Sequence, residues 1–224
     1  MGCYDQRVTA PIGLRERKKQ RTRQLLSETA RRLFSERGFE RVSIAEIARV
    51  ADVSEQTVFN YFPSKEDLVY SGLETFEDQL LAVIRDRPPG TTVIDAFGDF
   101  ILEPRGLLAT DDDAAARELI GVTRMIGASP ALLAREQQIL ARYTDALAQL
   151  IAEETGARAG DLRPDVVASA LISVHRALIA YVREHLEAGA SDRRQLARQV
   201  RQRGERALSL LSDGLGDYGA KRRP

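Results

Sequence analysis

The sequence predicts an all-α protein, with an N-terminal three-helix part followed by a larger helical part. Apolar residues recur at intervals of three and four along most of the 224 residues, which is the spacing of amphipathic helices. Strand signals are scarce: long alternating runs of Val, Ile and Thr do not occur, and no Asn-Gly or Asp-Gly turn joins two apolar stretches. Groups of Pro and Gly divide the chain into about nine to ten helices.

The first helix is indicated by an apolar face and by a glycine at its end. Gly38 follows this face directly, and glycine is favoured just beyond a helix C-terminus because it tolerates a positive φ. The apolar face consists of Leu26, Ala30, Leu33 and Phe34.

Two short helices follow, and each has a favourable residue at its start. Ser43 and Glu46 have the spacing of a capping box, in which the serine accepts from the Glu46 N–H and the carboxylate reaches back. Ser54 is a favourable N-cap for the third helix, and Pro63 ends that helix because the residue before a proline is pushed out of the helical region. Three such helices with a tight turn between the last two describe a helix-turn-helix unit.

A fourth helix is predicted from about Ser64 to Ile84, before a break at Pro88-Pro89-Gly90. Beyond this break we expect a short turn near Leu107. The remaining helices are expected at roughly 91–103, 111–127, 130–155, 164–187 and 192–212.

Composition and charge predict a globular, cytoplasmic protein with one basic end. The single cysteine, Cys3, can form no internal disulfide, which fits a reducing compartment. No apolar run approaches the roughly 20 residues that span a bilayer, so we expect no membrane partner. Residues 1–65 hold 13 Lys and Arg against 8 Asp and Glu, whereas residues 66–224 hold 20 against 25. The basic end therefore suits a polyanion.

The third helix is predicted to have a polar outer face that suits DNA. At about 100° per residue, Gln56 and Asn60 lie opposite the inward residue Val58, with Thr57 and Phe59 beside them. Amide side chains can pair bidentately with the N6 and N7 edge of adenine, and threonine can bond a phosphate or meet a thymine methyl. A helix of this width also fits the major groove.

Two further features would bind phosphates. Ser64 and Lys65 stand at the start of the fourth helix, where unpaired N–H groups and the helix dipole favour an anion. The segment LRERKKQRTR (14–23) is expected to be an arm before the first helix that contacts the DNA backbone or enters the minor groove; a solvated arm without a partner is the alternative. Its basic residues are Arg15, Arg17, Lys18, Lys19, Arg21 and Arg23.

The stretch FSERGFERVSIAEIARVADVSEQTVFNYFPSKEDL resembles the N-terminal domain of tetracycline-repressor-type (TetR family) regulators. Three ordered elements carry the resemblance: Phe34 to Phe39, Ser43 to Ala48, and Val53 to Leu68. The resemblance implies a helix-turn-helix DNA-binding domain over roughly residues 19–79, with the fourth helix linking on to about residue 87.

The resemblance also implies which residues touch DNA. Phe59 stands where the family most often has tyrosine, so a hydroxyl donor to phosphate is missing and Phe59 is expected to meet a thymine methyl or a sugar instead. Glu55 could accept from cytosine N4, or could repel phosphate and restrict the register. The positions that usually contact DNA are those of Ser43, Ser54, Gln56, Thr57, Phe59, Asn60, Tyr61 and Lys65.

By the same resemblance, residues 88–215 form a ligand-binding and dimerisation domain. We also expect residues 1–14 and 216–224 to be flexible tails. Helices 130–155 and 164–187 have wide apolar faces, so each is either central in a core or shared between subunits. We favour them as the interface of a two-fold homodimer, with a plain core as the alternative. A dimer would place two reading helices about 34–36 Å apart, on successive major-groove faces of a palindromic site.

Charged side chains within apolar helices indicate a candidate effector site. Arginine or histidine at a cavity rim could bind a carboxylate or phosphate of a small molecule whose tail lies among apolar side chains. A hydrogen-bonded core histidine and solvated or ion-paired arginines are the alternative. The candidate residues are Phe97, Phe100, Arg124, Met125, Tyr143, His175 and Arg176.

These observations predict a ligand-responsive, DNA-binding transcriptional regulator, in the first place a homodimeric repressor released by a small-molecule inducer. A transcriptional activator and a helical adaptor without DNA binding are the alternatives. The sequence holds no G-x-S-x-G, P-loop or H-E-x-x-H motif, so we expect no enzyme. Asp111-Asp112-Asp113 fits the start of a helix better than a metal site, and we expect neither a metal nor a cofactor.

Overall fold

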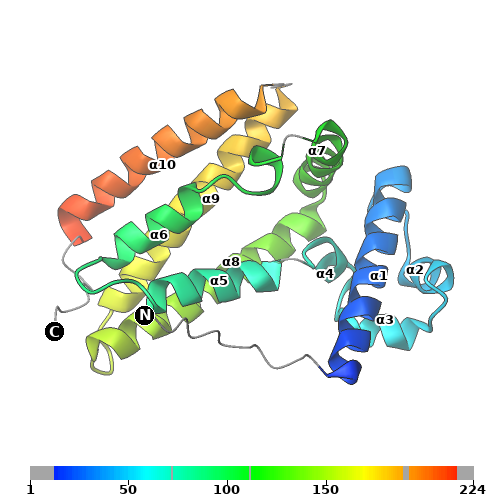
Figure 1. Ribbon diagram of the computed structural model, residues 1–224, viewed down its shortest axis with the longest axis horizontal. Helices are drawn as coiled ribbons and strands as arrows, with labels where there is room; N and C mark the ends of the chain where they lie inside the picture. The colour runs from blue at the N-terminus through cyan, green and yellow to red at the C-terminus, as the bar shows by residue number, and fades with distance from the viewer. Residues whose placement is uncertain (1–12, 72, 111, 189–191, 216–224) are drawn as a thin grey trace, which may run out of the picture. The chain divides into compact units, whose positions relative to one another are not determined.

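The computed structural model of the chain has two compact helical units (Figure 1). It describes residues 13–71, 73–110, 112–188 and 192–215. Over these residues the chain forms ten α-helices, one 3₁₀ helix and no strand, which confirms the predicted all-α class. Unit 1 runs up to Val69 and unit 2 starts at Tyr70. Asp111, residues 1–12 with Cys3, and the whole predicted tail 216–224 lie outside the described residues.

Unit 1 is a helix-turn-helix arranged around one apolar core. Its helices are α1 (Leu14–Arg37), α2 (Ile44–Val50), α3 (Glu55–Tyr61) and α4 (Lys65–Val69). Gly38 ends α1 with φ 84°, as predicted from its place after the apolar face. α1 packs against α2 and α4, and α2 packs against α3. The side chains buried at the centre are Leu26, Leu33, Phe34, Ile47, Val58, Phe62 and Leu68.

The turn between α2 and α3 is closed by a residue with a left-handed backbone. Asp52 has φ 56°, a region in which aspartate is tolerated better than most side chains. The following N–H, that of Val53, donates to the carbonyl of Ala48 at 3.0 Å and so satisfies a carbonyl at the end of α2. This geometry fixes the direction in which α3 leaves the turn.

The capping box predicted at Ser43 forms only in part. The Ser43 hydroxyl accepts from the Glu46 N–H at 3.1 Å, but the Glu46 carboxylate pairs with Arg37 of α1. A reciprocal capping box lies instead at Thr92 and Asp95, at the start of α6. Both arrangements satisfy N–H groups that a helix start leaves open.

The basic segment predicted as an arm is instead the first part of α1. Arg, Lys, Gln and Glu are good helix formers, and no Pro or Gly interrupts the chain between Gly13 and Gly38. Helical order therefore extends to Leu14, and the cationic side chains are carried on a helix.

The single fourth helix predicted from the sequence is two helices, α4 and α5 (Leu73–Arg85). Tyr70, which follows α4, is buried in unit 2 and donates its hydroxyl proton to the Leu132 carbonyl at 2.9 Å. Burial of an aromatic ring with a satisfied hydroxyl outweighs the few tenths of a kcal/mol per residue that helix continuity would give here. The helical pattern is therefore interrupted after Val69.

Unit 2 contains the remaining helices, and its long pair α8 and α9 packs side by side (Figure 1). The helices are α6 (Val93–Leu102), α7 (Asp113–Ala128), α8 (Pro130–Thr155), α9 (Arg163–Glu187) and α10 (Arg193–Leu215), with a 3₁₀ turn η1 (Gly106–Leu108). α9 also contacts α6, α7 and α10. Unit 2 is therefore arranged around α9.

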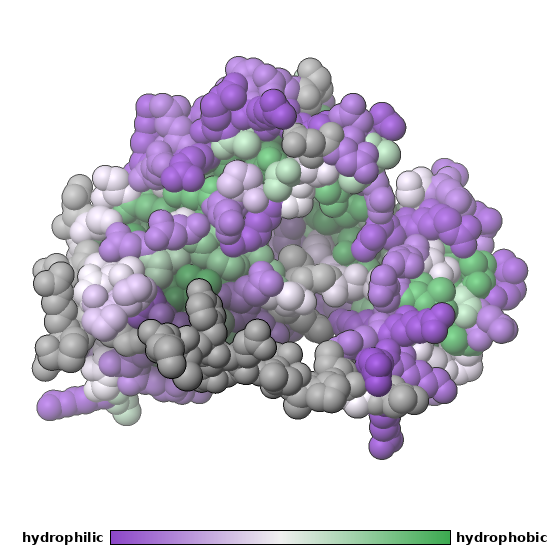
Figure 2. Space-filling model, in the orientation of Figure 1, coloured by the Kyte–Doolittle hydropathy of each residue, from purple (hydrophilic) through white to green (hydrophobic). Residues whose placement is uncertain are grey.

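Two glycines let α6 and α10 approach closely. A Cβ at Gly204 of α10 would lie 2.2 Å from Leu102 Cδ2, and a Cβ at Gly98 of α6 would lie 2.8 Å from Leu208 Cδ1. The exposed side of α10 is mostly polar, and its hydrophilic side chains are visible along the upper edge of Figure 2.

α9 is also the one helix in the described part of the chain whose length and hydropathy would suffice to cross a bilayer. One side of it packs against α6, α7, α8 and α10, and about a third of its apolar window is buried.

Candidate nucleic-acid interface and effector site

α3 is a short helix whose inner side is fixed by the core. Val58 and Phe62 are fully buried, as the periodicity of the segment predicts. Ser54 caps its start by accepting from the Thr57 N–H at 3.1 Å. Arg23 of α1 donates to the carbonyl of Tyr61 at 3.1 Å, and its guanidinium lies 4.6 Å from the centre of the Phe62 ring. α3 is therefore attached at both ends.

The outer face of α3 carries two exposed amides. Gln56 Nε2 donates to Asn60 Oδ1 at 3.1 Å, which holds the two side chains next to each other on the surface. Phe59 is 44% exposed beside them, and Glu55 is exposed at the start of the helix. An exposed aromatic ring beside paired amides gives donors, acceptors and an apolar surface of the kind that base edges and thymine methyls meet.

Four other predicted contact residues have structural roles in the free protein. The hydroxyls of Ser43 and Ser54 cap α2 and α3, and Thr57 Oγ1 lies 2.8 Å from Ser54 Oγ. Tyr61 is half-buried, and its carbonyl accepts from Arg23. These residues position α3, whereas Gln56 and Asn60 extend from it.

Lys65 joins α4 to the loop between α1 and α2. Its ammonium donates to the carbonyls of Phe39 and Val42 at 3.0 and 3.2 Å and lies 4.1 Å from the centre of the Phe39 ring. Two of its three N–H donors are therefore used within unit 1, which leaves one for a phosphate.

The anion site expected at the start of α4 is already occupied by a carboxylate of the chain. Asp67 Oδ2 accepts from both the N–H and the hydroxyl of Ser64, at 3.1 and 2.9 Å. A phosphate at this helix start would have to displace Asp67, which carries the same sign of charge. Lys65, and not the helix terminus, is the cationic group at this end of unit 1.

Unit 2 brings four aromatic side chains together from different helices. Phe76 of α5 lies at the centre, with ring centroids 5.1 Å from Phe100, 6.1 Å from Tyr143 and 5.2 Å from His175. Three of these four residues were candidates from the sequence. Phe76 was missed, although its place on the apolar face of α5 marks it as an inward residue. Phe97, a fourth candidate, is fully buried on α6.

His175 has a buried ring nitrogen without a partner. Its Nδ1 is shielded from solvent and makes no hydrogen bond, while the residue as a whole keeps some exposed surface. Burial, with a smaller contribution from the Arg105 charge, lowers the pKa of His175 to about 4. The imidazole is therefore neutral at physiological pH. Arg105 was not expected from the sequence; its guanidinium lies over the Phe100 ring and pairs with Glu103.

The two predicted arginines lie away from this aromatic cluster. Arg124 of α7 donates to the carbonyl of Leu186, which is roughly 16 Å further along α9 than His175. Arg176 follows His175 in the chain, but its side chain is exposed. Met125 is half-buried on α7. The predicted cation pair beside His175 is thus not assembled, because on a helix the neighbour of an inward residue points about 100° away.

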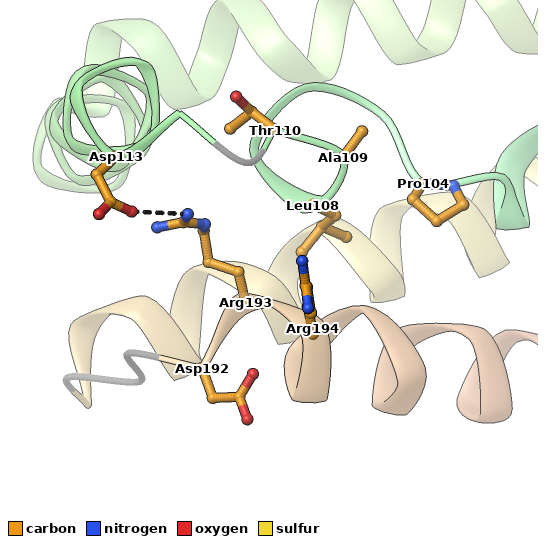
Figure 3. A pocket seen from close by; sticks show the side chains of 8 residues that line it. All are labelled: Pro104, Leu108, Ala109, Thr110, Asp113, Asp192, Arg193 and Arg194. Atoms are coloured by element: carbon orange, nitrogen blue, oxygen red, sulfur yellow. Dashed lines mark hydrogen bonds and ion pairs between the residues drawn. The ribbon is translucent and has the colours of Figure 1, made fainter.

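An open pocket of about 540 Å³ lies elsewhere in unit 2, between η1 and the starts of α7 and α10 (Figure 3). Arg193 crosses it to pair with Asp113 at 2.9 Å, so charges of both signs line the pocket. Within the described ranges, no group of three His, Cys, Asp or Glu side chains is arranged to hold a metal ion.

Two family models match the chain. Residues 26–70 match the model of bacterial regulatory proteins of the tetR family, and residues 94–215 match that of the MftR C-terminal domain. The second match covers more than half of the chain, and the first includes all of α2, α3 and α4.

Relatives and solved structures agree with these matches. The chain is 28% identical over 170 residues to the HTH-type transcriptional regulator TcmR of Streptomyces glaucescens, covering 73% of this chain and 74% of that protein. It is 27% identical over 165 residues to MftR of Mycobacterium tuberculosis, named for regulation of mycofactocin biosynthesis, covering 74% and 80%. The fold is similar to that of NalD of Pseudomonas aeruginosa, with a TM-score of 0.53 and 20% identity over 85% of this chain and 96% of NalD. Salmonella enterica GusR has a TM-score of 0.51 at 20% identity, over 93% and 98%.

Proposed function

Because this chain belongs to the TetR family of bacterial transcriptional regulators, we propose that it is a repressor that binds a palindromic operator as a homodimer and leaves it when a small-molecule inducer binds. A regulator of this kind works in the cytoplasm. The proposal is supported by the description of NalD, a protein of similar fold, as a repressor.

The observation that carries the proposal is the outer face of α3. Gln56 and Asn60 are exposed, bonded to each other and mounted on a helix that Ser54, Arg23 and the core hold in place. A rigid helix with paired amides can enter a major groove without first being ordered, and each amide can then read an adenine. The exposed cations of α1 would add phosphate contacts that carry no sequence information.

A homodimer through α9 fits the exposed residues of unit 2. The apolar stripe of α8 that suggested an interface is buried within unit 2. α9, by contrast, has an exposed face of small or apolar residues, and Val166 on it is 54% exposed. The exposed members of this face are Val166, Ser169, Ser173, Ala177 and Ala180. We therefore favour α9 over α8 as the centre of the interface.

DNA binding is tested with the intergenic DNA upstream of the chain's own gene. The wild-type protein is expected to shift this fragment in a salt-sensitive, sequence-preferring way. Gln56→Ala and Asn60→Ala should each cost about 1–3 kcal/mol of operator binding and relax the preference for that sequence. Lys18→Gln should weaken binding to operator and unrelated DNA alike. Gln149→Ala is a matched control, because Gln149 is an exposed amide of α8 that bonds Glu153 in the same i, i+4 geometry.

A fluorescence anisotropy titration over a range of salt concentrations separates these effects. An adaptor without DNA binding would be indifferent to all four substitutions. A wild-type protein that binds operator and unrelated DNA equally at every salt concentration would contradict the proposal. In vitro transcription with the operator fragment then distinguishes repression from activation.

The dimer is tested by charge on α9. Ala177→Glu combined with Ala180→Glu places two carboxylates on each copy of the exposed face, and like charges across a two-fold axis should convert the dimer to a monomer. Ala141→Glu, on the exposed polar side of α8, should leave the mass unchanged in analytical ultracentrifugation. Dissociation by Ala141→Glu and not by the α9 pair would assign the interface to α8 instead.

A further inference from the structure

We propose that the inducer is an uncharged aromatic molecule carrying a hydrogen-bond donor, and that it binds against His175 within the aromatic cluster of unit 2. This inference rests on the proposed function, since it names the chemical class of the inducer. It predicts an aromatic ring that stacks with the side chains of this cluster and a hydroxyl or N–H group directed at Nδ1.

The first support is the unpartnered Nδ1. A buried polar atom without a hydrogen bond is costly, and most such atoms in proteins are satisfied. A buried orphan N–H is rarer than a buried orphan acceptor, so the favoured tautomer has its proton on Nε2 and a free lone pair on Nδ1. The missing partner is therefore a donor. His175 is not fully enclosed, because part of the residue's surface stays exposed.

The second support is the composition of the surrounding wall. Phe76 stacks on the imidazole with an interplanar angle of 21°, and Tyr143 stacks on Phe76 at 25°. Phe100 meets Phe76 at 53°, and its ring is also in contact with the Arg105 guanidinium. Flat rings that already stack on one another favour a further flat ring, which gains both burial and the offset stacking geometry.

The third support is the absence of an available cation among the groups placed near His175. The imidazole itself is neutral, and the Arg105 guanidinium is engaged by Glu103 and by the carbonyl of Phe100. Arg124 bonds the far end of α9, and Arg176 is exposed. A carboxylate or phosphate brought into the cluster would lose its water and would have to displace Glu103 from Arg105 to gain a counter-charge, which is unfavourable. The structure thus favours a neutral ligand over the acidic ligand suggested by the sequence.

Three probes of one shape test the proposal on the full-length wild-type protein. 2-Naphthol carries a neutral donor, 2-methylnaphthalene has no donor, and 2-naphthoate is an anion. The chain has no tryptophan, so naphthalene fluorescence reports binding directly. We expect 2-naphthol to bind roughly tenfold more tightly than 2-methylnaphthalene, in line with one hydrogen bond to a buried acceptor, and 2-naphthoate to bind more weakly than either.

Imidazole ¹⁵N spectra locate the binding site. The chain has two histidines, His175 and His185, and His185 Nδ1 already lies 2.9 Å from the Tyr181 carbonyl. Selective labelling therefore gives two sets of signals. 2-Naphthol should move the Nδ1 signal of His175 upfield, the direction that follows acceptance of a hydrogen bond, whereas 2-methylnaphthalene should leave it nearly unchanged.

Variants provide the matched controls. His175→Phe keeps a flat ring and should reduce 2-naphthol binding to the level of 2-methylnaphthalene. His185→Phe, Arg124→Gln and Arg176→Gln should each leave the ratio between the probes unchanged. The proposal would be overturned if 2-naphthoate bound as tightly as 2-naphthol or more tightly, or if 2-naphthoate binding were lost in Arg124→Gln or Arg176→Gln. An unmoved His175 Nδ1 signal at saturating 2-naphthol would also overturn it. All three results can be obtained even if the His175→Phe protein does not fold.

These readouts are independent of DNA. If 2-naphthol binds at His175 but does not release the operator fragment, the ligand class stands and induction as proposed fails. If operator binding is absent while the probes still discriminate, the repressor function fails and the site remains.

Discussion

Unit 1 and unit 2 keep their key polar groups in opposite places. In unit 1, Gln56 and Asn60 lie on the surface of a seven-residue helix, which is held by its own N-cap Ser54 and by Arg23 of α1. In unit 2, the unpartnered nitrogen of His175 lies beneath the surface, among rings supplied by α5, α6 and α8. The exposed amides of α3 thus follow from spacing along one helix, whereas the candidate effector site is built from distant helices.

The largest effect on stability is expected from breaking a buried ion pair in unit 2. The Arg87 side chain is 1% exposed, pairs with Glu154 at 2.6 Å and donates to the carbonyls of Ile84 and Thr91. Arg87→Ala should lower the free energy of unfolding by about 3–5 kcal/mol, because Glu154 and two carbonyls lose their partner. Chemical denaturation measures this. Arg163→Ala, at an exposed pair with Asp161, should have a much smaller effect because solvent screens this pair; equal losses in the two variants would remove the contrast.

Acid should weaken unit 2 through His175. The pKa of His175 is about 4 in the folded chain, against an ordinary 6.5 when unfolded. Between these values the unfolded chain binds the extra proton, so stability is complete above pH 6.5 and falls as the pH drops toward 4, by about 3 kcal/mol in all. Denaturation at a series of pH values should show that the stability of the wild type falls between pH 6.5 and 4. The contribution of His175 to this fall should be missing in His175→Phe. An identical slope in both proteins would show that His175 is not the group responsible.

In unit 1, Lys65 should matter for folding as well as for DNA. Lys65→Met keeps the aliphatic stem but removes two hydrogen bonds to carbonyls and the contact with the Phe39 ring. We expect about 2 kcal/mol less stability, together with weaker DNA binding, since charged hydrogen bonds are worth more than neutral ones. Lys18→Gln, at an exposed position of α1, should weaken DNA binding alone. Unchanged stability in Lys65→Met would make Lys65 a pure phosphate contact.

The contact between α6 and α10 should distinguish crowded from open glycines in unit 2. Gly204→Ala places a methyl against Leu102 and is expected to cost about 1–2 kcal/mol, even after the gain in helix propensity. Gly121→Ala, on α7 with nothing within 4 Å of the new methyl, should instead raise stability by up to about 1 kcal/mol. Thermal unfolding measures both changes in stability. Changes of opposite sign for the two variants would support close packing of α6 on α10, whereas changes of the same sign would not.

The smallest effect is expected at the turn of unit 1. Asp52→Gly removes a side chain from a left-handed backbone position, φ 56°, and should stabilise the folded turn. Because glycine also makes the unfolded chain more flexible, the net gain should stay at or below about 1 kcal/mol. Asp52→Val should cost more than that, since a β-branched residue is poorly tolerated there. Stability that falls with glycine would point to a role for the carboxylate itself.

The sequence predicted most helices and the exposed amides because both depend on spacing along a few turns. Val58 and Asn60 fall on opposite sides of α3 by the geometry of one helix, whatever surrounds it. The predictions that were wrong, the complete capping box and the continuous fourth helix, depend on competing partners elsewhere in the chain. Glu46 pairs with Arg37 instead of completing its capping box, and Tyr70 interrupts a helical pattern to reach Leu132.

The candidate effector site could be predicted only in part for the same reason. His175 and Tyr143 are far apart in the sequence, and Phe76, which brings them together, has no feature that separates it from any core phenylalanine. The expected contribution of Arg124 failed because its carbonyl partner lies near the end of α9. The sequence shows on which face of its own helix a side chain lies. It does not show which faces of two packed helices contact each other.

Because the basic segment is already helical in α1, it should lose less conformational entropy when it binds DNA. Its 24 residues form a rod roughly 36 Å long, already ordered before any duplex is present. A loose tail would have to be immobilised on contact, with a large negative change in heat capacity; this rod would lose only the freedom of its side chains. Calorimetry of operator association should therefore give a heat-capacity signature of rigid docking, without the part that coupled folding contributes.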